Sequence, residues 1–533
     1  MQKRSSAQLS VPTDRTGYLW LVLGTLLSLV AVSGRWELSL AAWLSPLLLL
    51  RFTRTRSPFI GFPLVWLTQV SAMLFFLYES DLLHPGWIVA FPLFGTALAL
   101  PYLLDRLLAP RLGRVSGVLA TLLFPACQAA CEYLISFTPY GGLISLAYTQ
   151  YGNLPLLQLL SVTGIYGVSF LMAWFASIGN GIWEQRFAWP RIRPLTLLYS
   201  GALVLVLLFG CLRLTFFAPS SQTVRVAGIS AAANTYQHTP GPREMMQMVQ
   251  SNPAHLRARL STLDNELLDR TQAEARAGAR IVIWPEVGAQ VLASDEADLI
   301  RRAATLARSE HIYLDMGLGV FQPPATIRDQ AVLIGPDGRV LSTYNKAHPV
   351  PGLDPFASSA NPAPVVQTPY GRLSTAICFD ADFPSWMQQA ASKGVDIMLL
   401  PSNDWQAADP WHTHNATFRA IENGYSLVRQ ATGGLSMAVD EEGRVLAATD
   451  YFTTDQQTMI AYVPVKGTWT LYSRVGDLFA WLCIAGVLLL AGMGVWQALM
   501  ERRQVRVVGA DRFSPGSDLP FERERSEATG PMV

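Results

Sequence analysis

The sequence has little charge for its length. Only 15% of its 533 residues are charged, against roughly 25% in soluble domains, and half of them are hydrophobic. The mean hydropathy is +0.26. This composition excludes an ordinary soluble protein and indicates a membrane protein with a soluble part. The net charge of +1 gives no electrostatic basis for binding nucleic acid, so we expect no such partner.

Cysteine is also scarce, and no spacing of cysteine and histidine suits a zinc site, so we expect no metal and no cofactor. The five cysteines are Cys127, Cys131, Cys211, Cys378 and Cys483. Four of them lie in long apolar runs. Cys378 instead follows a short apolar stretch in "STAICFDADFPSW" and has no evident disulfide partner in the soluble part. A buried structural thiol is one interpretation of Cys378, and a nucleophile at a strand end is the other.

Long apolar runs dominate the rest of the chain. A membrane span needs about 20 mostly apolar residues. Candidate spans lie near 17–34, 36–50, 58–78, 86–104, 115–137, 156–183, 195–217 and 476–499. The first run lacks a small-residue cleavage pattern, so we expect a retained anchor and not a signal peptide.

The segment between the seventh and eighth spans has mixed polarity and is long enough for one domain with its own core. The expected units are an N-terminal bundle, a soluble domain, a last span and a disordered cytoplasmic tail, at 1–219, 220–472, 473–500 and 501–533.

Arginine marks alternate loops between the predicted spans. The residues are Arg51, Arg54 and Arg56; Arg106, Arg111 and Arg114; Arg186, Arg191 and Arg193; and Arg502, Arg503 and Arg506. Loops rich in arginine stay in the cytoplasm, so the pattern predicts cytoplasmic termini and a soluble domain on the outer face of the membrane.

The soluble domain has the pattern of an α/β fold. Apolar runs such as "ARIVIWPE", "RLSTAICFD" and "VDIMLLPSND" end in polar residues, and helical patterns separate several of them. "QAVLIGPDGRVLSTYNK" predicts two strands joined by a Pro-Asp-Gly turn. Polar residues at strand ends are where α/β folds build their sites.

Three of these strand ends each carry one reactive group: Glu286, Lys346 and Cys378. A carboxylate can take the proton of a thiol, and an ammonium can stabilise both the thiolate and an oxyanion, so the set suits acyl transfer. Taken singly, each has a simpler interpretation as a solvated cap, a surface charge or a core thiol. Lysine is rare here, at four of 40 basic residues, which makes Lys346 more informative.

The three segments "WPE", "YNK" and "ICFD" resemble, in order and spacing, the Glu-Lys-Cys triad of the nitrilase, or carbon–nitrogen hydrolase, superfamily. Segments outside the triad make the resemblance more specific, to one family of this superfamily. "GIYGVSFL", "SNDW", "HNATFRAIENG" and "GTWTLYSRVGD" are similar to segments of the apolipoprotein N-acyltransferase family, and the likeness extends to about residue 500.

The resemblance implies a nitrilase-like αββα sandwich inserted into an eight-helix bundle in the inner membrane of a bacterium. It implies that Glu286 is the general base and that Cys378 takes an acyl chain from the sn-1 ester of a phospholipid as a thioester. Lys346 and the backbone N–H of Phe379 would hold the oxyanion. The acceptor would be the amine of a lipoprotein's diacylglyceryl-cysteine, and we expect the enzyme to be a monomer.

Two acids depart from the family's pattern. Asp354, in "VPGLD", and Asp380, after Phe379, stand where the family usually has glutamate. Asp354 either orients Lys346 or forms a turn before proline. Two other functions stay open from the residues: a membrane-anchored amidase, and an inactive nitrilase-like domain that serves as a binding module.

Overall fold

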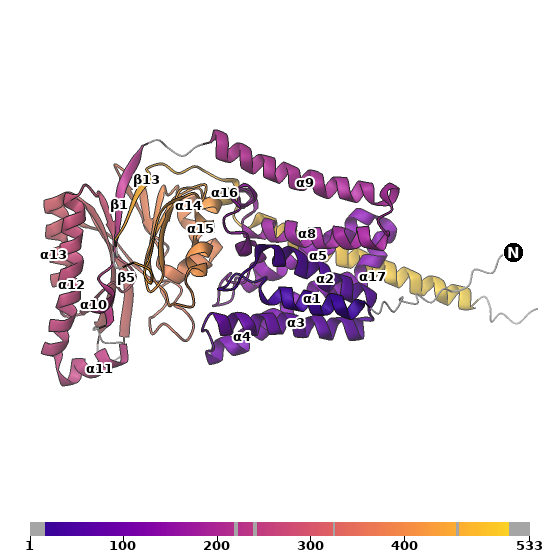
Figure 1. Cartoon of the computed structure of the whole chain (residues 1–533), viewed down its shortest axis with the longest axis horizontal. Coiled ribbons are helices and arrows are strands. Elements are labelled where there is room, and N and C mark those ends of the chain that lie inside the picture. The colour runs from indigo at the N-terminus through magenta and orange to yellow at the C-terminus, as the bar shows by residue number, and fades with distance from the viewer. Residues whose placement is uncertain (1–15, 218–221, 238–241, 323–325, 455–457, 511–533) are drawn as a thin grey trace, which may run out of the picture.

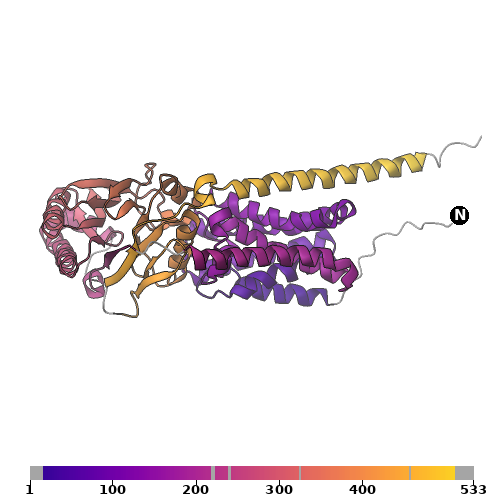
Figure 2. The ribbon, with the colours of Figure 1, turned by 90° about the horizontal axis from the view of Figure 1, so that it is seen from above.

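The computed structural model describes residues 16–217, 222–237, 242–322, 326–454 and 458–510. A bundle of helices forms one half of the described chain, and a two-sheet sandwich covers one end of it (Figures 1 and 2). The chain enters the sandwich after α9 and returns to the bundle through α17, as the order of polar and apolar segments predicts.

The long helices of the bundle lie where the apolar runs are. They are α1 (Gly17–Leu29), α2 (Ser39–Thr55), α3 (Pro58–Glu79), α4 (Pro85–Val115), α5 (Gly117–Ile135), α8 (Ile165–Glu184), α9 (Trp189–Phe216) and α17 (Leu478–Ala510). Among the described residues, six of them are long and apolar enough to cross a membrane. The helices α1 and α2, with 13 and 17 residues, fall short of that measure, so the count of eight spans stays a prediction.

The sixth predicted span is wrong in its first part. Its residues 156–164 contain the end of one short helix, α6 (Leu154–Leu157), and the whole of another, α7 (Leu160–Thr163), and the long helix α8 starts only at Ile165. The break falls at Gly164, whose φ is +64° and whose Cα faces the ring of Tyr472 so closely that a Cβ would lie 2.6 Å from it. Only glycine adopts this backbone at low cost.

Two helix ends also differ from those predicted from the sequence. α4 continues to Val115, so Arg106, Arg111 and Arg114 lie on its last turns and not in a loop. α17 continues to Ala510, so the stretch after residue 500 begins as helix and not as a disordered tail, because "MERRQVRVV" consists of residues that a helix tolerates. The rest of that tail, 511–533, lies outside the described residues.

The sandwich consists of two packed sheets, each with helices on its outer face. The first has the order β13-β1-β2-β4-β5-β6, with β3 beside β4. Its strands are β1 (Thr223–Ile229), β2 (Ile281–Ile283), β3 (Ala289–Leu292), β4 (Tyr313–Gln322), β5 (Thr326–Ile334), β6 (Val340–Asn345) and β13 (Thr458–Pro464). The second has the order β12-β11-β10-β9-β8-β7. Its strands are β7 (Val365–Thr368), β8 (Gly371–Thr375), β9 (Ile397–Asn403), β10 (Ser426–Thr432), β11 (Leu435–Val439) and β12 (Val445–Asp450).

The apolar strands are buried on both faces, which explains their unbroken hydrophobic runs. In β2, Ile281 and Ile283 face the second sheet, while Val282 packs under α12 (Pro253–Arg276) and α13 (Glu296–Glu310). In β9, Ile397 faces the first sheet, and Met398 packs under α14 (Pro384–Ser392) and α15 (Trp411–Asn423). The predicted αββα layering is therefore confirmed.

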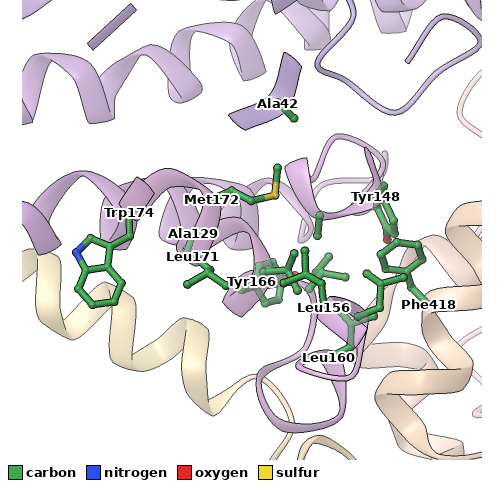
Figure 3. Packing of buried hydrophobic residues seen from close by; sticks show 14 of the residues in the cluster. Ala42, Ala129, Tyr148, Leu156, Leu160, Tyr166, Leu171, Met172, Trp174 and Phe418 are labelled. Atoms are coloured by element: carbon green, nitrogen blue, oxygen red, sulfur yellow. The ribbon is translucent and has the colours of Figure 1, made fainter. Parts of the chain in front are cut away.

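The sandwich and the bundle share a core. Phe418 of α15 packs against Tyr148 of the bundle with ring centroids 5.0 Å apart, and Leu156 and Leu160 lie beside them (Figure 3). The carboxylate of Glu422 accepts a hydrogen bond from the first backbone N–H of α8, at 2.9 Å. The two parts are thus held together by apolar packing and by buried polar contacts.

One buried acid makes the stability of the sandwich depend on pH. Asp315 lies between the sheets, where burial raises the pKa of its carboxyl to about 7, even though Thr375 donates a hydrogen bond to it. The unfolded chain has a carboxyl pKa of about 3.9. Folding therefore favours protonation, and stability is lost as pH rises from about 4 towards 7, by up to about 4 kcal/mol for this group.

We predict that Asp315→Asn removes this dependence. The melting temperature of the variant should exceed that of the parent by more at pH 8 than at pH 5. Asp269→Asn, at an exposed position on α12, is the control and should leave the difference between the two pH values unchanged. An equal effect of Asp315→Asn at both pH values would contradict the assignment.

Candidate active site

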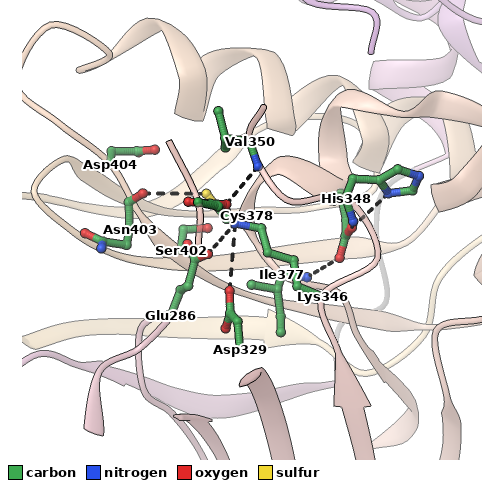
Figure 4. Close-up of polar contacts among 12 residues, drawn as sticks. Glu286, Asp329, Lys346, His348, Val350, Ile377, Cys378, Ser402, Asn403 and Asp404 are labelled. Carbon is green, nitrogen blue, oxygen red and sulfur yellow. Dashed lines mark hydrogen bonds and ion pairs between the residues drawn. The ribbon is translucent and has the colours of Figure 1, made fainter. Parts of the chain in front are cut away.

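The three reactive groups predicted from the sequence meet between the two sheets. Glu286 follows β2 and Lys346 follows β6 in the first sheet, and Cys378 follows β8 in the second. The three side chains converge from separate strand ends (Figure 4). All three are buried, with at most 3% of each residue exposed. The structure thus places a carboxyl group, a cation and a thiol in one enclosed site.

Lys346 lies at the centre of the charges. Its Nζ donates to Oε1 of Glu286 at 2.5 Å and to Oδ2 of Asp354 at 2.6 Å, and it lies 3.8 Å from Oδ2 of Asp329. Burial alone lowers the pKa of a lysine, but the charges of Glu286 and Asp354 outweigh it and raise the pKa of Lys346 well above its usual value. Lys346 therefore stays an ammonium and serves as a fixed positive charge.

The thiol of Cys378 is protonated in the resting site. Burial, and then the negative charge of Glu286, raise its pKa well above the usual value, and Lys346 only partly offsets them. A thiol is a poor nucleophile until it loses its proton. For Cys378 to act as a nucleophile, a base would have to take its proton, and the carboxyl group of Glu286 lies in the same site.

Cys378 sits on a strained turn that leaves backbone amides free. Its φ is +44°, a value that non-glycine residues adopt at a cost of roughly 1–3 kcal/mol and that is found most often at functional sites. It begins the short helix η2 (Cys378–Asp382). Among the described residues, the N–H groups of Cys378 and Phe379 have no hydrogen-bond acceptor. Such free amides at a nucleophile suit an oxyanion hole.

Asp380 holds the turn in place. Its Oδ2 accepts from the N–H of Ile377 at 3.0 Å and from the hydroxyl of Tyr344 at 2.8 Å. Its Oδ1 accepts from the N–H of His348 at 2.9 Å and lies 2.9 Å from the ring Nδ1 of the same histidine. One carboxylate therefore ties the nucleophile's turn to the segment after Lys346, so Asp380 positions the site and does not face the reacting atoms.

Asp354 makes the contact with Lys346 that the sequence left as one of two alternatives. Its Oδ2 pairs with Lys346 and also accepts from the N–H of Val350, four residues earlier in the loop, at 2.8 Å. The loop that carries it contacts the bundle. Trp87 of α4 donates from its ring to the carbonyl of Pro351 at 2.8 Å. The orientation of Lys346 thus depends on a loop that the membrane helices hold.

Sequence reasoning missed a third carboxyl group, that of Asp329 on β5. It is buried, it lies against the carboxyl group of Glu286, and its Oδ2 is 3.8 Å from Nζ of Lys346. Burial, and then the charge of Glu286, raise the pKa of Asp329 well above its usual value. Three ionised carboxylates around one ammonium would leave two uncompensated charges, which a buried site does not hold. Asp329 is therefore the group that keeps a proton.

Sequence reasoning also missed a chain of buried charges beside the thiol. His412 lies between Asp382, at 2.8 Å, and Asp404, at 2.7 Å, and Arg429 pairs with Asp404 at 2.7 Å. Burial lowers the pKa of His412, but the charges of the two aspartates outweigh this effect and raise the pKa to about 9. The motif "SNDW" contains Asp404, but no local pattern indicates its distant partners.

The same residues give the only cluster with metal-ligand geometry that the described ranges contain. Cys378, Asp404 and His412 present ligand atoms within 4.8 Å of one another. Both ring nitrogens of His412 face carboxylates, and Asp404 pairs with Arg429, so these donors are already engaged. A protonated histidine is no metal ligand. The donor set does not suit a resident metal.

Comparison with known proteins finds two family models on this chain. The one described as "Carbon-nitrogen hydrolase" matches residues 225–470, and the one described as "Apolipoprotein N-acyltransferase N-terminal domain" matches residues 20–178. The first covers the sandwich and all three reactive groups. The second covers the helices from α1 to α8.

Similar proteins carry the same description. An apolipoprotein N-acyltransferase of Geobacter metallireducens is 27% identical over 90% of this chain and 95% of its own length. One of Shewanella oneidensis is 24% identical over 70% of this chain and 73% of its own length. Among solved structures, an amidase from Nesterenkonia sp. matches with 20% identity and a TM-score of 0.37, over 49% of this chain and 95% of its own.

We predict that Asp354→Asn slows acylation of Cys378 by about 10- to 100-fold, the loss typical of residues that orient a reactive group. Asparagine can still accept from Val350, so the loop and the melting temperature should be preserved while the ion pair with Lys346 is lost. Asp354→Glu is the matched control and should recover activity if the loop accommodates one methylene. The measurement is single-turnover acylation. If Asp354→Asn acylated at the parental rate, the contact with Lys346 would not matter for acylation, and Asp354 would serve only to hold its loop.

We predict the opposite outcome for Asp329→Asn. Asparagine imitates a neutral carboxyl, so acylation at pH 7 should stay within about threefold of the parent. Glu286→Gln makes the same chemical change at the neighbouring carboxyl group and should lose at least about 100-fold, because it removes the proposed base. Equal losses in the two variants would mean that Asp329 acts in its ionised form.

Proposed function

Because the chain belongs to the apolipoprotein N-acyltransferase family, we propose that it transfers the sn-1 acyl chain of a membrane phospholipid to the N-terminal amine of a lipoprotein's diacylglyceryl-cysteine. The observation that carries this proposal is the buried contact of Lys346 with Glu286 and Asp354 beside the strained turn of Cys378. That arrangement supplies a base, a nucleophile and oxyanion donors for acyl transfer.

In the first half of the reaction, Glu286 takes the proton from the thiol of Cys378 as the sulfur attacks the carbonyl carbon of the ester. The oxyanion that forms lies within reach of the ammonium of Lys346 and the N–H of Phe379. When the tetrahedral intermediate collapses, the carbon–oxygen bond breaks, and the lysophospholipid oxygen takes the proton from Glu286. The products are an acyl thioester on Cys378 and a free lysophospholipid.

In the second half, the amine of the lipoprotein attacks the thioester carbonyl. Glu286 accepts a proton from the attacking nitrogen, the same donors hold the second oxyanion, and the sulfur leaves and regains its proton. The thioester retains the acyl-transfer potential of the ester, so formation of the amide is downhill. Both substrates are lipids or lipid-anchored, which suits a nucleophile that lies at the junction between the sandwich and the membrane bundle.

The two alternative functions explain less. A membrane-anchored amidase gives no role to an N-terminal bundle that matches its own family model over residues 20–178. An inactive binding module would not need a protonated thiol, a base and free amides held together against strain. The shortening of glutamate to aspartate at Asp354 and Asp380 is absorbed by the loop and the turn, since both carboxylates reach their partners.

The chain is an inner-membrane protein by its family and by the six apolar helices among the described residues. We propose eight spans and an outer-face, periplasmic sandwich, because the arginine-rich ends of the helices lie away from it. The proposed units are 1–219 for the first spans, 220–472 for the catalytic domain and 473–500 for the last span, with a cytoplasmic segment after it. We also propose that the monomer is active, because one chain supplies every site residue.

The proposal predicts a covalent intermediate. The parent protein incubated with phospholipid should gain the mass of one acyl chain, and Cys378→Ala should not. Lys346→Arg should keep the positive charge but lose acylation by about 100-fold or more, because the wider guanidinium misplaces it. Intact-protein mass spectrometry measures all three. A folded Cys378→Ala variant that still carried an acyl group would exclude this mechanism.

The acceptor is tested separately. In cells with the parent gene, mass spectrometry of lipoprotein N-termini should find a third acyl chain on the amine, and in cells with Cys378→Ala the amine should be free. An acyl-enzyme that forms in vitro while the lipoprotein amine stays free in cells would favour hydrolysis as the second step.

A further inference from the structure

A cavity lined by both charged and apolar residues lies at the end of the bundle that faces away from the sandwich. It has a volume of about 530 Å3 and lies between α4, α5, α8 and α9, with Arg54 of α2 at its wall. The helix ends that form it are the C-terminal ends of α2, α4 and α8 and the N-terminal ends of α5 and α9. Since the sandwich follows the other end of α9 (Figure 1), the length of the bundle lies between these helix ends and the domain that carries Cys378.

The charges around the cavity are not balanced. Three arginines, Arg54, Arg106 and Arg191, line it together with two acids, Asp105 and Glu184. Arg54 already satisfies Asp105 through two hydrogen bonds of 2.8 Å. The side chain of Arg106 donates only to a backbone carbonyl, and among the described residues the exposed guanidinium of Arg191 has no hydrogen-bond or ion-pair partner. A positive charge on a membrane protein, next to low-dielectric surroundings, calls for a counter-anion.

Neutral donors face the same space. α5 begins at this cavity, and the N–H groups of Gly117 and Val118 have no acceptor among the described residues. The start of a long helix attracts anions through such free amides and its dipole. The hydroxyl of Ser177 also lines the cavity; it is fully buried and without a partner in the described part of the chain. These hydrogen-bond donors face one cavity, and no acceptor for them lies among the described residues.

The depth of the cavity identifies the source of the anion. Trp183, in the last turn of α8, and Trp189, the first residue of α9, lie at the end of the bundle that holds the cavity, and tryptophan concentrates at the level of lipid headgroups. α9 itself is only slightly buried, so its sides face lipid. Basic pockets between membrane helices at this level typically hold anionic headgroups. A phosphate group at the level of the lipid headgroups is therefore more readily that of a lipid than a free phosphate ion from solution.

The geometry points to a second lipid site: the cavity binds the headgroup phosphate of an anionic phospholipid in the leaflet opposite the sandwich. Arg106 and Arg191 pair with the phosphate, the start of α5 and Ser177 donate to its oxygens, and the acyl chains lie along α5 and α9. This lipid is a bound ligand and not an acyl donor, since it is remote from Cys378.

The test measures lipid binding by native mass spectrometry of the full-length protein in neutral detergent. The probe is ether-linked phosphatidylglycerol, which has no ester to transfer; ether-linked phosphatidylcholine and inorganic phosphate are tested beside it. The parent should bind phosphatidylglycerol most tightly. At about 1 kcal/mol for each basic residue, Arg191→Gln should weaken binding roughly fivefold and Arg106→Gln/Arg191→Gln roughly 30-fold.

Arg193→Gln is the matched control, because Arg193 is exposed on the same helix two residues away and does not line the cavity. It should leave the dissociation constant unchanged. An equal loss in Arg193→Gln and Arg191→Gln would overturn the site in favour of diffuse surface charge. Inorganic phosphate bound as tightly as the lipid would overturn the assignment to a lipid. The single variant Arg191→Gln decides the question even if Arg106→Gln fails to fold.

Discussion

The buried ammonium of Lys346 is the charge on which the arrangement of the site depends. A lysine with 1% exposure survives only if carboxylates compensate it, and Glu286 and Asp354 do so at 2.5 and 2.6 Å. With one cation and two anions the site already holds a net negative charge, so further ionisation is suppressed. This single constraint explains why Asp329 is neutral and why the thiol of Cys378 rests in its protonated form.

The same constraint shapes the chemistry. Because the thiol is protonated at rest, the proposed nucleophile forms only when substrate allows Glu286 to take its proton, which protects the thiol from side reactions. The positive φ of Cys378 and the hydrogen bond from Ile377 to Asp380 hold the turn so that the N–H groups of Cys378 and Phe379 stay without an acceptor among the described residues. Their cost in strain and unmade hydrogen bonds is offset by the packing of the sandwich.

The sequence predicts the parts of this site that depend on local pattern. Apolar runs that end in "WPE", "YNK" and "ICFD" place Glu286, Lys346 and Cys378 at strand ends, and strand ends of a sandwich meet. It does not predict Asp329, which lies inside β5, or the pairing of His412 with Asp382 and Asp404, because these contacts join segments that only the tertiary fold brings together. Nor does the apolar run at 156–183 reveal its interruption, which depends on the ring of Tyr472 against Gly164.

Helices of the membrane bundle contact the loops that carry the site residues. Trp87 of α4 holds the loop of Asp354, and the ring of Trp405, next to Asp404, donates to the carbonyl of Ser80 at 2.6 Å. Phe379 lies in the same apolar cluster as residues of α3 and α4. Three loops of the site are therefore fixed by membrane helices and not by the sandwich alone. Without the bundle, the sandwich would lose the hydrogen bonds that hold the loops of Asp354 and Asp404, so the bundle supports the site as well as anchoring it.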